Sequence, residues 1–211
     1  MTTRPNQPIK LYGVRLSGHA HRVELFLNLL RLPYEYATVD LGSGEQKSPA
    51  YLAKNRFGQV PVIEIGDLVL ADSNAILVYL AMRYGDETWY PRDAIGAARV
   101  QRWLSVAAGQ VAFGPAAARL VTVFKAPFNH VEVCERAHKL FAVMEEELKQ
   151  SPYLVCDTVT IADIANYSYI AHAPEGGVSL EAYAHIRAWL ARIEALPGFI
   201  GMPKSPLPAA A

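Results

Sequence analysis

The sequence has few cysteines, no net charge and no long apolar run. Only two of its 211 residues are cysteine, Cys134 and Cys156. Two are too few for a disulfide-built fold, and they match no zinc motif. The 20 basic and 20 acidic side chains cancel, which argues against a broad electrostatic surface for nucleic acid or an anionic membrane. No apolar run reaches the roughly 18 to 20 residues that span a bilayer, and the first ten residues do not resemble a secretory signal. We therefore expect a reduced, soluble, cytoplasmic protein that binds neither nucleic acid nor membrane.

The composition favours a folded protein with a large core. Hydrophobic residues make up 52% of the chain and charged residues 19%, so disorder is not expected. A length of 211 residues fits one large domain or two small ones. The character of the sequence changes near position 86, and this change predicts two domains, over residues 1–85 and 86–211.

Strand and helix signals alternate in the first domain. They predict the order β-α-β-α-β-β-α, in which the opening β-α-β unit implies a parallel pair of strands. Residues 61–65 and 68–71 flank Gly66-Asp67 and predict an antiparallel hairpin. The expected fold is therefore an α/β domain with a mixed sheet, followed by an all-α domain.

The second domain shows helix signals and no convincing strand. Asp93 and Asn129 are typical helix caps, and Thr160 with Asp163 forms a capping box in which Asp replaces the usual Glu. The first helix is rich in alanine, and we expect Gly114-Pro115 to kink or interrupt it.

Two short segments of the first domain could bind a peptide-like ligand. Asp72 and Ser73 open a helix and could be a plain N-cap. Alternatively, the helix end and the Ser73 hydroxyl hold a carboxylate while Asp72 accepts from an ammonium group, which are the two charges of an amino-acid head. If the Val60–Pro61 bond is cis, the Val60 backbone can pair with an extended peptide; an ordinary trans turn is the alternative.

Ser17 lies between the first strand and the first helix. It could cap that helix, or its hydroxyl, at the positive end of the helix dipole, could donate to a bound thiolate. The loop holds no cysteine, so the thiol would have to belong to a ligand. His19 and His21, near Glu24, lack any further ligand spacing, so we expect ordinary polar contacts and no metal or general base there.

Three stretches together resemble the glutathione-site signature of the cytosolic glutathione S-transferases. They are GEQKSP at 44–49, NRFGQVPV at 55–62 and ADSNAI at 71–76, and TIAD at 160–163 joins them in the helical half. The resemblance covers roughly residues 8 to 200. It implies a thioredoxin-like first domain, an all-helical second domain, a homodimer, and glutathione as the co-substrate without a metal.

The resemblance also implies what the residues of the first domain do. Val60, before a cis Pro61, matches the position whose backbone pairs with the cysteinyl part of glutathione. Asp72 and Ser73 match the residues that hold the γ-glutamyl head, and Gln59 matches a side chain that contacts the tripeptide backbone.

Three further residues are carried over from the resemblance. Lys47 matches the lysine that faces the glycyl carboxylate in phi-like members, and Gln46 stands where many of those members have His. Ser17 matches the activating serine of the serine-type classes. The loop departs from the zeta class, which has Ser-Ser-Cys here, and from the omega and beta types, which have a cysteine.

The leading hypothesis is transfer of glutathione to a small hydrophobic electrophile. The electrophile should lie between the domains, against walls from the first loop and the long helix: Val14, Arg15, Leu16, Gln110 and Phe113. One alternative is glutathione-dependent reduction of disulfides or peroxides. Another is a non-catalytic module of the same fold that binds a ligand or a protein partner.

Overall fold

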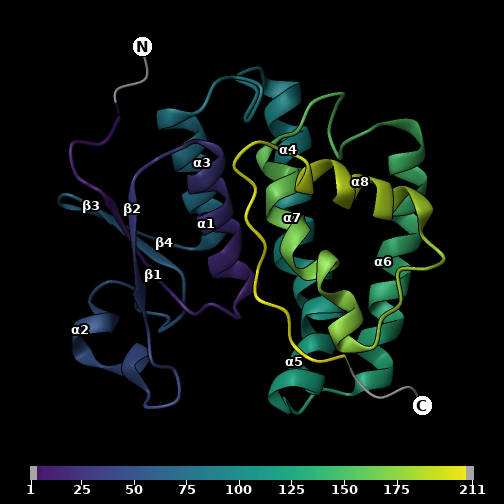
Figure 1. Cartoon of the computed structure of the whole chain (residues 1–211), viewed down its shortest axis with the longest axis horizontal. Coiled ribbons are helices and arrows are strands. Elements are labelled where there is room, and N and C mark those ends of the chain that lie inside the picture. The colour runs from purple at the N-terminus through teal and green to yellow at the C-terminus, as the bar shows by residue number, and fades with distance from the viewer. Residues whose placement is uncertain (1–3, 208–211) are drawn as a thin grey trace.

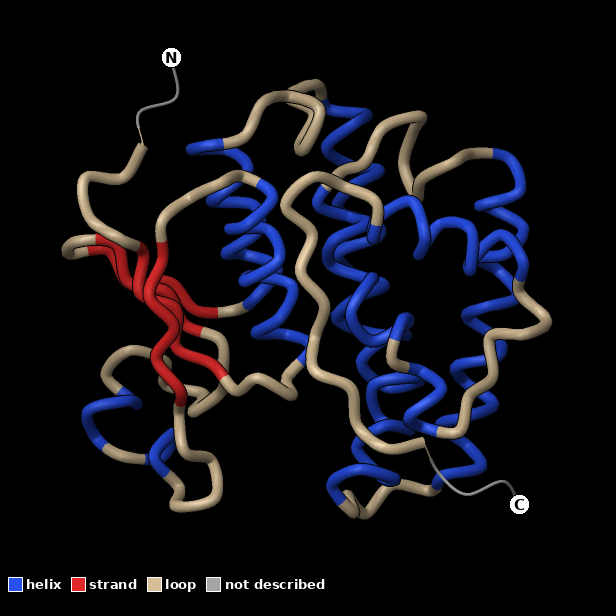
Figure 2. Tube along the Cα trace, viewed as in Figure 1, coloured by secondary structure: helices blue, strands red, loops and turns tan. Residues whose placement is uncertain are grey.

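The computed structural model describes residues 4–207. Two parts lie side by side, and Figures 1 and 2 show that all the strands belong to the N-terminal one. The elements of this first part are β1 (Ile9–Gly13), α1 (Gly18–Leu29), β2 (Tyr34–Thr38), the short 3-10 helix η1 (Glu45–Lys47), α2 (Pro49–Leu52), β3 (Val62–Ile65), β4 (Leu68–Ala71) and α3 (Ser73–Tyr84).

The sheet has the predicted mixed topology. Its strand order is β2-β1-β3-β4. β1 and β2 are parallel, with Ile9 opposite Tyr34, and both β1–β3 and β3–β4 are antiparallel. The predicted hairpin is confirmed: Ile65 pairs with Leu68, and Gly66 between them has φ 58°, which glycine adopts without steric cost.

Among the described residues of the second part, all the regular secondary structure is helical. The helices are α4 (Ala94–Val106), η2 (Ala107–Ala116), α5 (Ala117–Phe124), α6 (His130–Gln150), α7 (Ile161–Ala171), the 3-10 helix η3 (Ala173–Gly176) and α8 (Ala184–Glu194). Asp93 and Asn129 cap α4 and α6 through their side chains. Thr160 and Asp163 form the predicted capping box of α7.

At Gly114-Pro115, where a kink or an interruption was expected, the regular α-helical pattern is interrupted but the helix does not end. α4, η2 and α5 form one continuous helix, in which η2 is a π-helix that contains Pro115. Proline has no amide N–H, and the i→i+5 hydrogen bonding of a π-helix changes the pattern that an α-helix would require there. Gly114 serves helix packing instead: a Cβ at this position would lie 3.1 Å from the backbone nitrogen of Ala137 in α6.

This continuous helix, Ala94–Phe124, is long and apolar enough to cross a membrane by length and composition alone. It has 31 residues, and the mean hydropathy of its most apolar window is 1.3. Charged residues such as Arg102 and Arg119 divide it, so no uninterrupted apolar run of that length was expected from the sequence. In the fold the helix is part of a bundle: it packs on α6 and α7, and 44% of the window is buried.

One hydrophobic core joins the two parts, because α1 and α3 both pack on α7. The C-terminal segment, drawn in yellow in Figure 1, runs along the junction. His21 of α1 binds it through Nε2, 3.0 Å from the Ile200 carbonyl oxygen, while Nδ1 lies 2.8 Å from Ser168 Oγ. Burial lowers the pKa of His21 to about 4, so the ring is neutral at pH 7. The proline-rich tail continues this strap, with a buried Met202; residues 208–211 lie outside the described part.

Candidate active site

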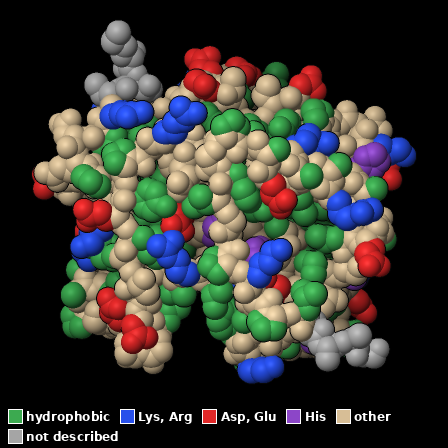
Figure 3. Space-filling view, viewed as in Figure 1, with side chains coloured by type: hydrophobic (Ala, Val, Ile, Leu, Met, Phe, Trp, Pro, Cys, Tyr) green, Lys and Arg blue, Asp and Glu red, His purple; other side chains and the backbone are tan. Residues whose placement is uncertain are grey.

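A cleft of about 820 Å³ lies between the two parts. Figure 3 shows a hollow between their lower ends, flanked by hydrophobic side chains. The cleft brings together residues that are far apart in the sequence: Ser17, Gln46, Gln59, Val60, Pro61, Asp72 and Ser73 all line it. These are seven of the eight residues for which the resemblance implies a role in thiol activation or glutathione binding.

Ser17 caps α1 and faces the cleft at the same time. Its Oγ accepts from the backbone N–H of Ala20 at 3.3 Å, and its own N–H donates to the Val14 carbonyl at 2.9 Å. The cap places the half-buried hydroxyl at the positive end of a 12-residue helix. The two interpretations of Ser17, as a helix cap and as a ligand contact, are therefore compatible.

The helical part holds the loop before Ser17 through Arg119 of α5. Arg119 donates from Nη1 to the Leu16 carbonyl at 2.9 Å and from Nε to Glu175 at 2.5 Å. Both members of this ion pair are buried. Burial acts to raise the pKa of Glu175, but hydrogen bonds from Arg119, the Ser205 N–H and His172 keep it below its ordinary value. A charged and fully bonded pair thus links the active-site loop to the second part.

Asp72 and Ser73 open α3 beside Ser17. Asp72 Oδ1 accepts from the N–H groups of Asn74 and Ala75, each at 2.9 Å. Asp72 has φ 71°, a left-handed conformation that a non-glycine residue adopts at an energetic cost. Such strain is typical of functional positions, where surrounding contacts hold it in place.

Arg22 lies behind this pair, and nothing in the sequence pattern had marked it as a site residue. Its side chain is 1% exposed, and Nη1 donates to Ser73 Oγ at 3.3 Å and to Asn74 Oδ1 at 3.0 Å. Nε and Nη2 are buried without a partner among the described residues. Burial lowers the pKa of Arg22 to about 10, with Tyr169 and Asp72 acting in the opposite direction, so it is charged at pH 7. A buried cation with unused donors suits an anionic ligand group nearby.

The opposite wall of the cleft consists of loop residues before β3. The Val60–Pro61 bond is cis, as the resemblance implies. The Gln59 carbonyl accepts from Asn55 Nδ2 at 2.8 Å and from the Tyr51 hydroxyl at 3.1 Å, which fixes the backbone of this loop. Gln46 has a buried Oε1 with no partner in the described chain, so a ligand donor could satisfy it.

The two lysines of this region differ in their placement. Lys47 is exposed on η1 and does not line the cleft, so its contact with a glycyl carboxylate stays a prediction. Lys54 does line the cleft and forms an ion pair with Glu64. It stands outside the signature positions, which is why the sequence did not indicate it.

The predicted walls for a second substrate are placed differently. Gln110 and Phe113 line a separate groove between the long helix and α6, and Val14 and Leu16 contribute backbone carbonyls to the loop contacts described above. The residues of the long helix that face the cleft are Ala112, Ala116 and Leu120. Gln110 and Phe113 lie in the π-helical stretch, where the usual 3.6-residue spacing does not tell which side of the helix faces the cleft. The sequence signal that could have identified this wall is the spacing of its apolar residues, Ala112, Ala116 and Leu120, which lie four positions apart.

The two loop histidines diverge in the structure. His21 is bonded to Ser168 and the C-terminal strap, whereas His19 lines the cleft and packs edge-on against Tyr169, with ring centroids 5.0 Å apart. Burial and the nearby Arg22 lower the pKa of His19 to about 3, so it is neutral and a poor general base at pH 7. Across residues 4–207, no three His, Cys, Asp or Glu side chains are grouped to hold a metal ion.

Comparisons with known proteins agree with this geometry. Residues 7–82 match the family described as "Glutathione S-transferase, N-terminal domain", and residues 123–197 match "Glutathione S-transferase, C-terminal domain". The chain is 36% identical to glutathione S-transferase 3 of Zea mays over 208 residues, which cover 91% of each protein.

Solved structures give the same result. A glutathione S-transferase from Pseudomonas fluorescens superposes with a TM-score of 0.88 at 35% identity, covering 93% of this chain and 99% of the other. A glutathione transferase homologue from Drosophila mojavensis, solved with bound glutathione, has a TM-score of 0.81 at 32% identity, with coverage of 90% and 89%.

Proposed function

This chain belongs to the glutathione S-transferase family, and we propose that its cleft binds glutathione and ionises the thiol for attack on a small apolar electrophile. The fold, with a thioredoxin-like domain and a helical domain, is the one that this activity uses in the family. We place the domain boundary at residues 85 and 86, and we expect the protein to work in the cytoplasm, as soluble members of the family generally do.

The observation that carries the proposal is the shared cleft. It combines a hydroxyl at a helix N-terminus (Ser17), an acid and a hydroxyl at a second helix N-terminus (Asp72 and Ser73), and the Val60 backbone. Each group suits one part of γ-glutamyl-cysteinyl-glycine. The Arg22 guanidinium behind Ser73 adds a positive charge and unpaired donors for the γ-glutamyl carboxylate.

We assign the chemistry to the thiol of the ligand. Cys134 lies on α6 and Cys156 in the loop before α7, so neither can serve as a nucleophile in the cleft. The Ser17 O–H would donate to the glutathione sulfur, and the α1 dipole would favour its negative charge. The thiol proton passes to solvent. The sulfur then forms a bond to the electrophilic carbon, and the leaving group departs with its bonding pair.

Binding and reaction can be tested together on the wild-type protein. We expect saturable glutathione binding in calorimetry and conjugate formation with an activated aryl chloride. Preferential reduction of a glutathione mixed disulfide, with no conjugate, would favour the redox alternative. Absence of glutathione binding would contradict the proposal and leave the non-catalytic module.

The helix wall should determine the size of the electrophile. Ala112→Phe would fill the apolar side of the cleft, so kcat/KM for a bulky aryl electrophile should fall about tenfold or more. The KM for glutathione should change less than twofold, because the residues proposed to bind glutathione belong to the first domain and not to this helix. Steady-state kinetics with a small and a bulky electrophile measure both effects.

A matched control exists one helical turn away. Ala108 is exposed and lines neither the cleft nor the groove near α6, so Ala108→Phe should leave both constants unchanged. An unchanged preference between bulky and small electrophiles in Ala112→Phe would refute the assignment of this wall.

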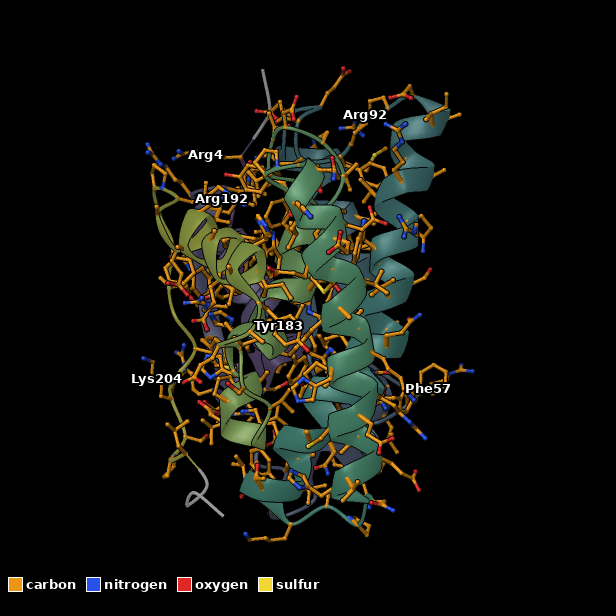
Figure 4. The ribbon with its side chains drawn as sticks, turned by 90° about the vertical axis from the view of Figure 1, so that its right-hand side faces the viewer. Arg4, Phe57, Arg92, Tyr183, Arg192 and Lys204 are labelled. Carbon is orange, nitrogen blue, oxygen red and sulfur yellow. The ribbon has the colours of Figure 1, made fainter. Side chains whose placement is uncertain are left out.

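We also propose that the protein is a homodimer joined through Phe57. This side chain is 87% exposed, and Figure 4 shows it pointing away from the body of the molecule. An exposed aromatic side chain of this size suits a pocket on a partner. The chain itself offers a largely apolar groove of about 800 Å³ between the long helix and α6, which includes Trp103, Phe113 and Val143. With two-fold symmetry, each copy would insert Phe57 into the groove of the other.

Removing this side chain should weaken the dimer. Burial of one phenyl ring contributes about 1.5–3 kcal/mol, and the symmetric interface contains two, so Phe57→Ser should raise the dimer dissociation constant about 100-fold or more. Sedimentation velocity over a range of concentrations would measure this. Phe128→Ser, at an exposed phenylalanine outside the groove, should keep the wild-type constant. A monomeric wild type, or an unchanged Phe57→Ser, would contradict the proposal.

A further inference from the structure

Arg119 of α5 is a buried cation that does not line the active-site cleft. It is 1% exposed, and its guanidinium makes three hydrogen bonds, each to a different segment of the chain. Nε donates to Glu175 of η3, Nη1 donates to the Leu16 carbonyl of the active-site loop, and Nη2 donates to Ser205 Oγ of the C-terminal strap. The proposed function, in which Ser17 acts on the thiol, gives Arg119 no role.

Stability alone does not explain a buried ion pair at this place. Removing two charges from water costs free energy, and apolar side chains of similar volume often pack as stably. The chain is nevertheless built closely around the pair: a Cβ on Gly176 would lie 2.6 Å from the backbone nitrogen of Arg119, so only glycine lets η3 lie this close to α5. A guanidinium differs from an apolar side chain in having donors that point in fixed and different directions.

The bond to the loop holds the peptide unit that precedes Ser17. The Leu16 carbonyl and the Ser17 N–H belong to this one planar unit. Arg119 Nη1 holds the carbonyl end at 2.9 Å, and the Val14 carbonyl holds the N–H end, also at 2.9 Å. With both ends held, the plane cannot rotate freely, and the backbone position from which the Ser17 side chain starts is fixed.

The Ser17 hydroxyl needs this support, because its own cap bond is long. The Ala20 N–H lies 3.3 Å from Ser17 Oγ, whereas N–H···O bonds are usually about 2.9–3.0 Å long. Ser17 is also only half-buried, so packing on its side chain does not fix the hydroxyl by itself. A donor that is displaced by about 1 Å loses much of its effect on a developing charge. The position of the loop backbone therefore matters for thiol ionisation.

We propose that Arg119 is a positioning residue: it holds the peptide unit between Leu16 and Ser17 so that the Ser17 hydroxyl can donate to the glutathione sulfur. Arg119 acts through Ser17 and does not touch the ligand. Glu175 fixes the direction of the guanidinium and balances its charge, so the effect is on geometry. The inference rests on the proposed function, because it requires Ser17 to act on the thiol.

The test replaces the ion pair by two neutral side chains, Arg119→Met together with Glu175→Gln. Neither charge is then left buried alone, and the bond to the Leu16 carbonyl is lost. We expect the pKa of the bound glutathione thiol to rise by about 1, from about 6.5 to about 7.5, so that the thiolate fraction at pH 7 and kcat both fall about threefold. The KM for glutathione should stay within twofold, because the residues proposed to bind glutathione are unchanged.

Ser205→Ala is the matched control. It removes the bond from the same guanidinium to the strap and leaves the bond to Leu16, so it should lower the thermal midpoint without moving the thiol pKa. The thiolate absorbance is read only from the glutathione complex, so partial loss of folded protein does not alter the measured pKa. If the double replacement does not fold, Arg119→Lys keeps a cation beside Glu175 with one nitrogen in place of the forked donors, and it should raise the thiol pKa as well.

A Ser17→Ala background separates the outcomes. The double replacement should add nothing there, since Arg119 acts through Ser17. A further rise of the same size in that background would mean that Arg119 affects the sulfur independently, and it would overturn the positioning role. Equal rises in Ser205→Ala and in the double replacement would overturn it too.

This inference and the proposed function fail in different ways. An unchanged thiol pKa in the Arg119 variants, with a raised one in Ser17→Ala, would overturn the inference and leave the proposed function intact. Failure of the proposed function would show in the wild type itself, as a thiol pKa that binding does not lower.

Discussion

Ser17→Ala should raise the pKa of the bound glutathione thiol from about 6.5 to near that of a free thiol, about 8.5. The Ser17 oxygen caps α1 by accepting from the Ala20 N–H, and the hydroxyl faces the cleft, so its loss removes the hydrogen bond that its proton would donate to the developing thiolate. At pH 7 the thiolate fraction would fall from about three quarters to about one thirtieth. Together with the loss of transition-state stabilisation, kcat should drop about 100-fold.

The measurement is a pH titration of thiolate ultraviolet absorbance in the glutathione complex. Ser17→Thr keeps both the hydroxyl and the helix cap, so it should retain most of the pKa depression. The alanine variant should also lose about 1 kcal/mol of stability with the cap, and this is why the thiol pKa is the decisive readout. If Ser17→Ala titrates like wild type, Ser17 does not activate the thiol.

The largest effect on stability is expected at Asp163, at the start of α7. Its buried carboxylate accepts four hydrogen bonds. Oδ1 accepts from the Leu154 N–H and from Trp189 Nε1, both at 2.9 Å, and Oδ2 accepts from the Thr160 N–H at 2.8 Å and the Thr160 hydroxyl at 3.1 Å. Asp163 therefore joins the loop before α7, the capping box and α8.

Asp163→Asn keeps the size of this side chain but turns one acceptor into a donor. The new amide N–H₂ would face the N–H of Thr160, and a buried donor left unsatisfied costs about 1–3 kcal/mol in addition to the weakened bonds to a former charge. We expect a total loss of about 3 kcal/mol and a fall in the thermal midpoint of about 6–12 °C.

Thermal unfolding of the two proteins at one protein concentration would measure this, because the proposed dimerisation would make the midpoint concentration-dependent. Asp157→Asn is the control: it is the same substitution at an exposed aspartate in the preceding loop, and it should change stability by less than about 0.5 kcal/mol. Equal midpoints for the Asp163 and Asp157 variants would show that the four bonds add little to stability.

Local patterns were reliable where a few neighbouring residues decide the backbone. The hairpin at Gly66, the capping box at Thr160 and the parallel β1–β2 pair all follow from turn residues, caps and short spacings. At Gly114-Pro115 the α-helical pattern is interrupted, as expected, but by a π-helical stretch that keeps the helix continuous. Gly114 is needed there for the close approach of α6, which no local pattern contains.

The residues proposed to bind glutathione could be selected from the sequence for a related reason. Gln59, Val60, Asp72 and Ser73 lie within 15 positions of one another, on a loop, a hairpin and a helix start whose geometry is local. Their chemistry is recognisable because a zwitterionic head and a peptide backbone require particular polar groups in a particular order.

By itself, the sequence determined the order of strands and helices, the caps, and the residues on the first domain that suit glutathione, because these depend on backbone preferences over a few residues. Only the tertiary structure decided which groups of the helical domain meet them. Arg119 holds a carbonyl 103 positions away, and Tyr169 lies against a loop at the opposite end of the chain. Such contacts depend on which helix faces pack together across the whole core, and helical periodicity identifies an apolar face without identifying its partner.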